Sequence, residues 1–535
     1  MNQASFHTRD SLEDDEPTLV RIAGDGAATH GARPFGRVLA VALGLALSIS
    51  VSYVVPSLHG LRPWVPGGEY VPFWNLVGRE LLAEPADDEH EPQKVAELRR
   101  KLLPAPLPKP MPAVTREVPL TKFPAYTPAA EAAAYPLEHP EALQHYFARL
   151  SLADLGVRGA IARAGHWGDS VLGLDGITSA IRRRLQGRFG DAGHGFHMMD
   201  RYHPSYVQQG VGFNPGKEWL SCLIVSQCNK AEARYGYGGL ISRSPGGAAS
   251  AFWTPREGFG RSVSRFQIWF ERHPAGGNVQ IFVDGAVNAA FSTRASVVSD
   301  GWYELRLPEG GHEFVVHAAG RGEVRSYGVV LENDGPGVTW DGMALIGGST
   351  RALRTQAPEH AASQIRHRDL DLIVFMFGGN DMGRKYADLS SSMDPYLEEF
   401  ADVISHFRAG KPELSCLVMT LTDHGERAAD GRIVSRPFAR KLSRAQAEVA
   451  RRNGCAFFDT YQATGGEGTA ARWARSQPRL INPDLGHPTS EGHELIATLL
   501  SQAVLEAYER YRVQMVGKPL PITRSEAPVP NELSR

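Results

Sequence analysis

The stretch Gly165-His-Trp-Gly-Asp-Ser170 stands between two segments of different character. Before it, residues 157–164 are short and fairly apolar, which predicts a buried strand. After it, residues 174–188 carry apolar side chains at helical spacing. We therefore expect Ser170 at a strand-to-helix turn, where open α/β sheets place reactive groups and a helix N-terminus offers free N–H donors. The alternative for Gly-Asp-Ser alone is a helix cap.

Two later stretches favour the reactive alternative. The apolar run 371–377 ends in Gly378-Gly-Asn-Asp381, and Asp484-Leu-Gly-His487-Pro precedes an apolar helical pattern. A serine hydroxyl attacks well only when a base takes its proton, and a carboxylate orients a histidine for that role. Asp484 and His487, three residues apart, can both project from one turn. The negative oxygen formed on attack needs donors, which Asn380 and nearby backbone N–H groups can supply.

These blocks, in this order, resemble the SGNH/GDSL hydrolase family. The matching residues are Gly168-Asp-Ser170, Gly378-Gly-Asn-Asp381 and Asp484-x-x-His487-Pro, and the resemblance covers roughly residues 150–512. It implies an α/β fold with a doubly wound, parallel, five-stranded sheet of the SGNH or flavodoxin-like type. Aligned on Asp341, the family's oxyanion glycine falls on Ala344, a departure from the family pattern, with Gly347 nearby.

The resemblance assigns roles to particular residues. Ser170 would be the nucleophile, His487 the base and Asp484 the group that orients it. The oxyanion donors would be Asn380, the N–H of Ser170, and the backbone at Ala344 or Gly347. Three further residues are expected on the substrate side: Asp169, His166 and Trp253. His424 and His493 are not expected to act as bases.

The N-terminal region predicts a membrane anchor. Residues 38–55 are 18 residues without a charge, close to the roughly 17–25 that span a bilayer. Arg33 and Arg37 precede them, which favours a cytoplasmic tail over residues 1–37. A cleaved signal peptide is the rival interpretation. Residues 56–140 are Pro-rich and predict a periplasmic linker. We expect a single-pass protein of the bacterial inner membrane with its catalytic domain in the periplasm.

Residues 205–335, called the inserted segment below, have a β texture. Short runs with period-two alternation recur between Gly and Pro turns, and Asp284-Gly285 is a tight-turn signal. We expect an all-β jelly-roll sandwich. It resembles the carbohydrate-binding-like module inserted at this point in bacterial peptidoglycan O-acetylesterases. Trp253 is one of its aromatics that could stack on a sugar, although most such aromatics are core residues.

The flanking segments read as the two parts of the hydrolase domain, residues 141–204 and 336–512, followed by a loose tail over 513–535. Alternating strand and helix patterns imply helices on both faces of the sheet. The expected strands are 342–347, 372–377, 415–421 and 454–459, and the expected helices are 141–152, 359–368, 395–408, 437–452 and 490–512.

Composition narrows the function further. Lys and Arg total 57 against 59 Asp and Glu, for a net charge of −2, and no basic stripe appears, so nucleic acid is not an expected partner. Neither a metal nor a cofactor is expected, since no Cys or His cluster has ligand spacing. Cys222 and Cys228 would lie too far apart in an extended run. Cys416 and Cys455 start strands that can be neighbours, but free buried thiols are the default for all four.

Together these features predict a membrane-anchored serine esterase. The family resemblance and the β insertion imply that it removes acyl groups, in particular acetyl groups, from a cell-envelope glycan such as peptidoglycan. Its partners would be the acylated polysaccharide and the inner membrane. Two alternatives remain: an O-acetyltransferase acting on the same kind of glycan, and a non-catalytic glycan-binding scaffold.

Overall fold

The computed structural model describes residues 121–130, 132–382 and 389–521. All of them fall within one compact unit, Glu91–Arg535. None of the helices in these ranges is long and apolar enough to cross a membrane. The predicted tail, the predicted anchor at 38–55 and most of the predicted linker lie outside the described residues.

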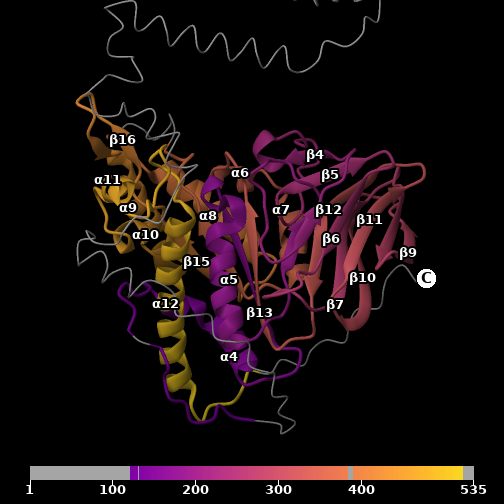
Figure 1. Ribbon diagram of the computed structural model, residues 1–535, viewed down its shortest axis with the longest axis horizontal. Helices are drawn as coiled ribbons and strands as arrows, with labels where there is room; N and C mark the ends of the chain where they lie inside the picture. Colours follow the sequence, from indigo (N-terminus) through magenta and orange to yellow (C-terminus); the bar gives the residue numbers. More distant parts are fainter. Residues whose placement is uncertain (1–120, 131, 383–388, 522–535) are drawn as a thin grey trace, which may run out of the picture. The chain divides into compact units, whose positions relative to one another are not determined.

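A parallel five-stranded sheet forms the centre of this unit (Figure 1). Its strand order is β13 (Gly337–Ala344), β1 (Ile161–Gly168), β14 (Leu372–Met376), β15 (Ser415–Met419) and β18 (Ala456–Phe458). Every neighbouring pair is parallel. The strands are almost wholly buried, as expected when helices cover both faces. The predicted α/β class with a parallel sheet is confirmed.

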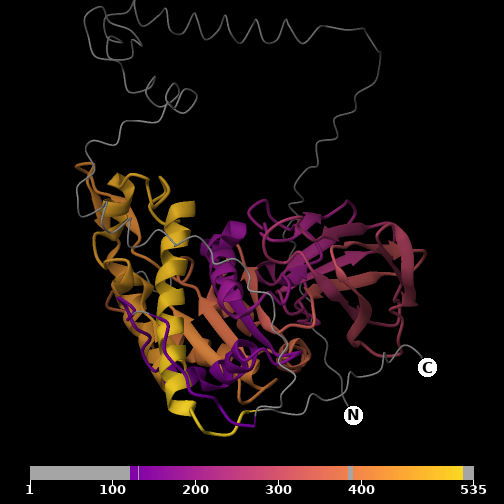
Figure 2. The same ribbon diagram turned by 60° about the horizontal axis from the view of Figure 1, so that its bottom comes forward.

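Successive residues of one strand enter different hydrophobic cores. Leu372, Val374 and Met376 of β14 pack with α4 (Gln144–Asp154), α5 (Gly176–Phe189) and α12 (Ser490–Met515). Ile373 and Phe375 pack on the other face with α7 (Pro358–Arg368), α8 (Asp394–Arg408) and α9 (Pro437–Arg452). Figure 2 shows α5 and α12 side by side on the face of the sheet to which Leu372, Val374 and Met376 point. The period of two along a strand therefore produces the doubly wound arrangement.

The first strand starts later than the sequence predicts. We expected residues 157–164, whereas β1 is Ile161–Gly168. Gly156 and Gly159 both have positive φ, 70° and 77°, so the chain turns there before it can extend. The strand carries buried polar residues such as Arg163, and this polar content hid it from a hydrophobicity pattern.

Between β1 and β13 the chain forms two antiparallel sheets. One has the order β10 (Ser299–Gly310), β7 (Val263–Arg272), β12 (Val324–Glu332), β5 (Leu240–Ser244) and β4 (Leu220–Leu223), with β2 (Gly195–Met198) paired to β12. The other has the order β3 (Gly212–Asn214), β6 (Ala249–Trp253), β11 (Glu313–Ala319), β8 (Asn278–Val283) and β9 (Ala286–Ser292). A shared core joins them, in which Phe266 of β7 stacks on Phe314 of β11 with ring centroids 4.1 Å apart.

Asp284 and Gly285 form the predicted tight turn between β8 and β9, with φ of 51° and 81°. The jelly-roll class and the carbohydrate-binding character of the inserted segment stay predictions.

The antiparallel region is fused to the parallel sheet. β2 lies before residue 205, the expected start of the inserted segment, yet it pairs with β12. The indole of Trp167 on β1 meets the ring of Tyr237, which in turn contacts Trp269 of β7. These aromatic side chains belong to one buried core that also includes α7 and α8.

A buried ionic network crosses the same boundary. The Glu332 carboxylate of β12 accepts hydrogen bonds from Arg163 of β1 at 3.0 Å, and also from Arg265 and Arg368. Arg368 of α7 in turn donates to Asp341 of β13 at 2.7 Å. Buried, hydrogen-bonded charges of opposite sign therefore link the two regions across this boundary.

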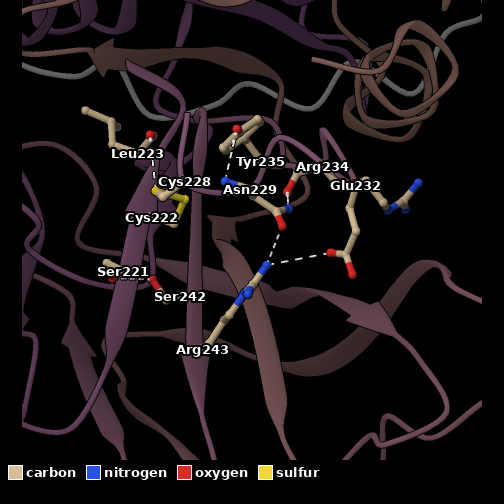
Figure 3. Close-up of a disulfide and its surroundings, with 10 residues drawn as sticks. All are labelled: Ser221, Cys222, Leu223, Cys228, Asn229, Glu232, Arg234, Tyr235, Ser242 and Arg243. Atoms are coloured by element: carbon tan, nitrogen blue, oxygen red, sulfur yellow. Dashed lines mark hydrogen bonds and ion pairs between the residues drawn. A yellow bond between two sulfur atoms is a disulfide. The ribbon is translucent and has the colours of Figure 1, made fainter. Parts of the chain in front are cut away.

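The default assignment of free thiols is wrong for all four cysteines. Cys222 and Cys228 form a disulfide, because η4 (Ile224–Ser226) and a left-handed Gln227 turn the chain back and bring the Cα atoms to 5.9 Å (Figure 3). The run does not stay extended, as the sequence reasoning assumed. Cys416 of β15 pairs with Cys455, just before β18, which realises the pairing that the sequence left open.

The remaining described elements are short: η2 (Pro140–Leu143), η3 (Ser170–Asp175), α6 (Thr350–Arg354), β16 (Gly425–Arg427), β17 (Ile433–Ser435), α10 (Thr460–Ala463) and α11 (Thr469–Arg475).

Candidate active site

Ser170 lies at the carboxyl end of β1, where the strand turns into η3. Asp169 is the residue before η3, and its carboxylate accepts a hydrogen bond from the N–H of Val171 at 3.0 Å. The turn is tight: a Cβ on Gly168 would overlap the carbonyl of Met376 and the side chain of Leu172. The cap and the reactive turn proposed from the sequence are therefore the same structure.

His487 and Asp484 lie in the loop between α11 and α12, far from Ser170 in sequence. The Ser170 hydroxyl is 2.7 Å from His487 Nε2, and His487 Nδ1 is 2.7 Å from an Asp484 oxygen. The other Asp484 oxygen accepts the N–H groups of Gly486 and His487, each at 3.0 Å. The structure thus joins all three residues in one hydrogen-bonded series, called the relay below.

The charges of the relay favour proton transfer from Ser170 to His487. Burial favours a higher pKa for Asp484, but the two backbone N–H groups and the His487 side chain outweigh it and hold that pKa below its usual value. Asp484 is therefore an anion at neutral pH. It fixes the proton of the imidazole on Nδ1 and leaves Nε2 as the acceptor that faces Ser170.

The Gly-Gly-Asn loop after β14 is attached to Asp169. The second Asp169 oxygen accepts the N–H groups of Gly378 at 3.2 Å and Gly379 at 3.0 Å. Asp169 is buried, and burial raises its pKa against the effect of these backbone donors. With its oxygens engaged and no exposed surface, it positions two loops. The prediction that Asp169 contacts substrate is wrong.

Asn380 and Gly347 meet beside this loop. Asn380 is exposed, and its Nδ2 donates one hydrogen bond to the carbonyl of Gly348 at 2.7 Å, so a second N–H of the amide remains. Gly347 is also exposed, with φ of 76°, in a turn closed by Gly348 N–H donating to the Leu345 carbonyl at 2.7 Å. Within the described residues, the Gly347 N–H donates no hydrogen bond.

Ala344 is placed differently. It is buried as the last residue of β13, opposite Gly168 in the ladder with β1, and its carbonyl accepts a hydrogen bond from Tyr202. Of the two backbone positions that the sequence left open, Gly347 is the exposed one. The sequence could not separate them because the turn after β13 has no signature of its own.

His166 is not at the site surface. It is fully buried on β1, its ring lies edge-on to Trp340, and its Nδ1 accepts from the Trp340 indole N–H at 3.3 Å. Burial lowers its pKa to about 3, so it is neutral. The expectation that it contacts substrate is wrong, because it lies within β1, four positions before Ser170, and its side chain is fully buried in the core.

Trp253 lies at the end of β6, in the inserted segment. Its side chain is 41% exposed and lines a hollow of about 690 Å³ that contains none of the relay residues. It is therefore exposed, as a binding residue must be, but belongs to a separate surface.

Two residues at the site were not predicted in these places. The Tyr202 hydroxyl accepts the N–H of Ile346 at 3.2 Å, besides donating to Ala344, and so holds the turn that carries Gly347. The His424 ring lies against Gly379 and Gly486, with its Nδ1 3.0 Å from the Thr422 carbonyl. Burial lowers the His424 pKa to about 4, consistent with its not being the base. The signal in the sequence that could have placed His424 at the site is its position shortly after the parallel strand β15.

His493 lies in the first turn of α12 and packs against Gly176, and burial lowers its pKa to about 4. Across the described ranges, no group of three or more His, Cys, Asp or Glu side chains is arranged to hold a metal ion.

Comparison with known proteins agrees with this geometry. Residues 309–495 match the model of the GDSL-like lipase/acylhydrolase family, a range that contains Asn380, Asp484 and His487. This match confirms the resemblance that the motifs indicated. No curated protein sequence matches the chain.

Solved structures extend the match across the fold. A peptidoglycan O-acetylesterase is similar at a TM-score of 0.57 and 17% identity, over 68% of this chain and 96% of that one. A family 3 carbohydrate esterase from Talaromyces cellulolyticus has a TM-score of 0.23 and 14% identity, over 32% and 72%. A family two carbohydrate esterase from Clostridium thermocellum has a TM-score of 0.23 and 12% sequence identity, and the match covers 54% of this chain and 97% of that one. Of these three similarities, only that to the peptidoglycan O-acetylesterase supports the fold.

Proposed function

We propose that the protein is a serine esterase that removes O-acyl groups, in particular O-acetyl groups, from a glycan of the cell envelope such as peptidoglycan. The observation that carries the proposal is the relay: Ser170, His487 and Asp484 are joined by two hydrogen bonds of 2.7 Å. They lie at the edge of a parallel sheet where exposed donors, Gly347 and Asn380, also gather.

In the first half of the reaction, Ser170 Oγ attacks the ester carbonyl while its proton passes to His487 Nε2. The imidazolium that forms is stabilised by Asp484, which stays ionised. The N–H groups of Ser170 and Gly347 and the second N–H of Asn380 stabilise the oxyanion. When the intermediate collapses, the bond to the sugar oxygen breaks and His487 gives its proton to that oxygen. The acyl group remains on Ser170.

In the second half, water attacks the acyl-enzyme. His487 takes a proton from the water and a second tetrahedral intermediate forms. When it collapses, its bond to Ser170 Oγ breaks, His487 returns the proton to Oγ, and the carboxylic acid leaves. The His487 and Asp484 side chains are 46% and 53% exposed, so water reaches the relay directly. This exposure favours hydrolysis over transfer to a second sugar, which requires water to be excluded.

The choice of substrate is supported by the solved structure with which this chain shares its fold, a peptidoglycan O-acetylesterase that is covered over 96% of its length. A hydrophobic lipid substrate would need an apolar channel at the relay. The exposed relay instead suits a polar ester carried on a large, solvated polymer.

We also propose that the catalytic domain faces the periplasm, anchored by residues 38–55. The two disulfides support a location outside the cytoplasm, because the cytoplasm keeps thiols reduced. A topology reporter fused after Arg535 tests this: it should be active only in a periplasm-specific form. Recovery of the full-length chain as a soluble cytoplasmic protein would contradict the proposed location.

The direct assay is release of acetate from O-acetylated peptidoglycan and from a small chromogenic acetate ester. The same polymer after chemical de-O-acetylation is the blank. Adding a neutral sugar acceptor separates hydrolysis from transfer, since a transferase would form an acetylated acceptor at the expense of free acetate. Absence of turnover on every ester, with binding retained, would favour the non-catalytic scaffold.

A further inference from the structure

A surface hollow away from the relay is formed entirely by the inserted segment. It lies where β6, the β8–β9 turn and the start of β11 meet, and it has a volume of about 690 Å³. The side chains that give it chemical character are Trp253, Arg256, Arg261, Asp284, His312 and Glu313. Figure 1 shows β6 and β11 next to each other in the sheet that carries it. None of these residues takes part in the relay.

Trp253 is held as a flat platform. It pairs with Gly212 across β3 and β6, and a Cβ built on Gly212 would overlap the indole ring atoms Cε2, Nε1 and Cδ2. The ring therefore lies flat against the backbone of Gly212, which only glycine permits. One face is packed and the side chain is still 41% exposed, so the other face is open to a ligand.

Two cationic side chains beside this platform, Arg256 and Arg261, make no hydrogen bond or ion pair in the described residues, although the charge of Arg261 also acts on the nearby Asp191. Both arginines are exposed. Most other arginines of the inserted segment, such as Arg234, Arg265 and Arg325, are engaged by carboxylates. An arginine fork recognises a carboxylate through two parallel hydrogen bonds.

The acidic groups of the hollow do not neutralise both arginines. Asp284 is committed, since it accepts from His312 Nδ1 at 2.8 Å and from the Glu313 N–H at 2.9 Å. His312 Nε2 lies 2.9 Å from the Pro308 carbonyl, so both ring nitrogens face acceptors and the charged form of the ring is favoured. Glu313 is the one remaining carboxylate among the described lining residues.

We propose that this hollow binds an acidic glycan, with a sugar ring stacked on the open face of Trp253 and a carboxylate held by Arg256 and Arg261. This inference rests on the proposed function, because it supplies the polymer-holding surface for the same reaction. A carbohydrate presents a flat C–H face that packs on an aromatic ring, and a carboxylate is the group that two adjacent arginines select. Binding energy from such a remote contact helps to retain a polymer near the relay.

Binding is measured by calorimetry on the full-length chain carrying Ser170→Ala, so that turnover does not consume the probe. The probe is a soluble mixture of peptidoglycan fragments. Two comparison probes are the same fragments with their carboxyl groups amidated, and a neutral chitooligosaccharide. We expect the acidic fragments to bind about tenfold more tightly than either comparison probe. Raising the salt concentration should narrow this difference.

Variants locate the binding. Trp253→Ala should weaken the affinity for the acidic fragments about tenfold, and so should the double change Arg256→Gln with Arg261→Gln. Gly212→Val should act like Trp253→Ala because it displaces the indole. Arg294→Gln is the matched control. This exposed arginine lies two residues after Ser292, which pairs with Asn278, the first residue of β8, whereas Asp284 follows the last residue of β8. The control variant should bind like the parent.

Unchanged affinity in both Trp253→Ala and the double arginine variant would overturn the proposal, as would equal binding of the amidated and acidic fragments. Trp253 and both arginines are exposed, so these variants should fold even if Gly212→Val does not. With Ser170 restored, Trp253→Ala and the double arginine variant should each hydrolyse the small acetate ester at the parent rate. Failure of the proposed esterase would show as no hydrolysis at all, whereas failure of this inference would show only in binding.

Discussion

Ser170, His487 and Asp484 have separable roles at the scale of single residues. Ser170→Ala and His487→Ala should each lower kcat on an acetate ester at least about a thousandfold, because either change removes the nucleophile or its base. Asp484→Asn should retain more activity, since the carboxylate orients and stabilises without exchanging the proton. Circular dichroism is the control for folding. Full activity in a folded Ser170→Ala protein would sink the assignment.

Asp381, next to the Gly-Gly-Asn loop, should make stability depend on pH. Burial and the neighbouring Asp169 raise its pKa from 3.8 to about 7. A raised carboxyl pKa means that the folded state holds its proton more tightly than the unfolded state. Stability is therefore lost as pH rises from the unfolded pKa to the folded pKa, and the full penalty remains above about 7.

Asp381→Asn removes this penalty while its Oδ1 still accepts from Thr350, which contacts Asp381 through Oγ1 at 3.2 Å. The gain in unfolding free energy should be larger at about pH 8 than at about pH 5, by up to roughly 2–3 kcal/mol. Urea titrations at both pH values measure it. A gain that is equal at both, or larger at the lower pH, would contradict the assignment.

Sequence alone placed the relay correctly, because a serine, an amide and an Asp/His pair in a fixed order leave few alternatives. It failed at His166 and Asp169, which flank the same serine. The expected strand, residues 157–164, would have ended before His166, whereas β1 continues to Gly168 and holds His166 inside the strand with its side chain in the core. No local pattern reports the burial of Asp169 under a loop 209 residues away.

At the scale of elements, Asp169 couples the end of β1 to the loop after β14. Asp169→Asn should leave the protein folded but lower kcat about tenfold to a hundredfold, with KM less affected, because an amide cannot accept all three backbone N–H groups at Val171, Gly378 and Gly379. Steady-state kinetics on the small ester measure the split.

The matched control is Asp191→Asn. That carboxylate also accepts two backbone N–H groups, of Gly193 at 2.9 Å and Gly260 at 2.7 Å, but outside the site. It should change stability without lowering kcat. An equal fall in kcat for both variants would mean that Asp169 is only structural.

The long helices of the parallel-sheet domain could be predicted from periodicity, and α9 lies at its predicted residues, 437–452. The short strands β2, β3, β5 and β6 were missed, since three to five residues carry too little alternation to stand out. The Cys222–Cys228 disulfide was missed for a related reason: its turn rests on a left-handed Gln227 that the sequence does not mark.

At the scale of the whole molecule, Glu332 joins the antiparallel region to the parallel sheet. Glu332→Ala leaves Arg163, Arg265 and Arg368 without their common carboxylate, and should lower the free energy of unfolding by about 3–5 kcal/mol. Chemical denaturation measures the loss. Glu448→Ala is the control, because that carboxylate is partly exposed and forms its ion pairs with Arg451 and Arg452 on the helix surface, so its loss should leave stability unchanged. An unchanged free energy of unfolding in Glu332→Ala would contradict the proposed coupling between the two regions.

This coupling changes how the inserted segment can be tested. Replacing it by a flexible linker would expose Trp167 and the rest of the shared aromatic core, so loss of activity would not report on glycan binding. The contiguous residues 205–335 suggested a separable module, but the shared core depends on tertiary contacts that sequence patterns do not contain. Point changes at the Trp253 surface are the appropriate probe.

The central claim is that Ser170 hydrolyses acyl esters on an envelope glycan. The most direct measurement is acetate released from O-acetylated peptidoglycan by the full-length protein and by its Ser170→Ala variant, with folding of both verified. We predict steady release by the parent protein, abolished by the substitution. Equal release by both proteins, or none from any ester with the relay intact, would contradict the account.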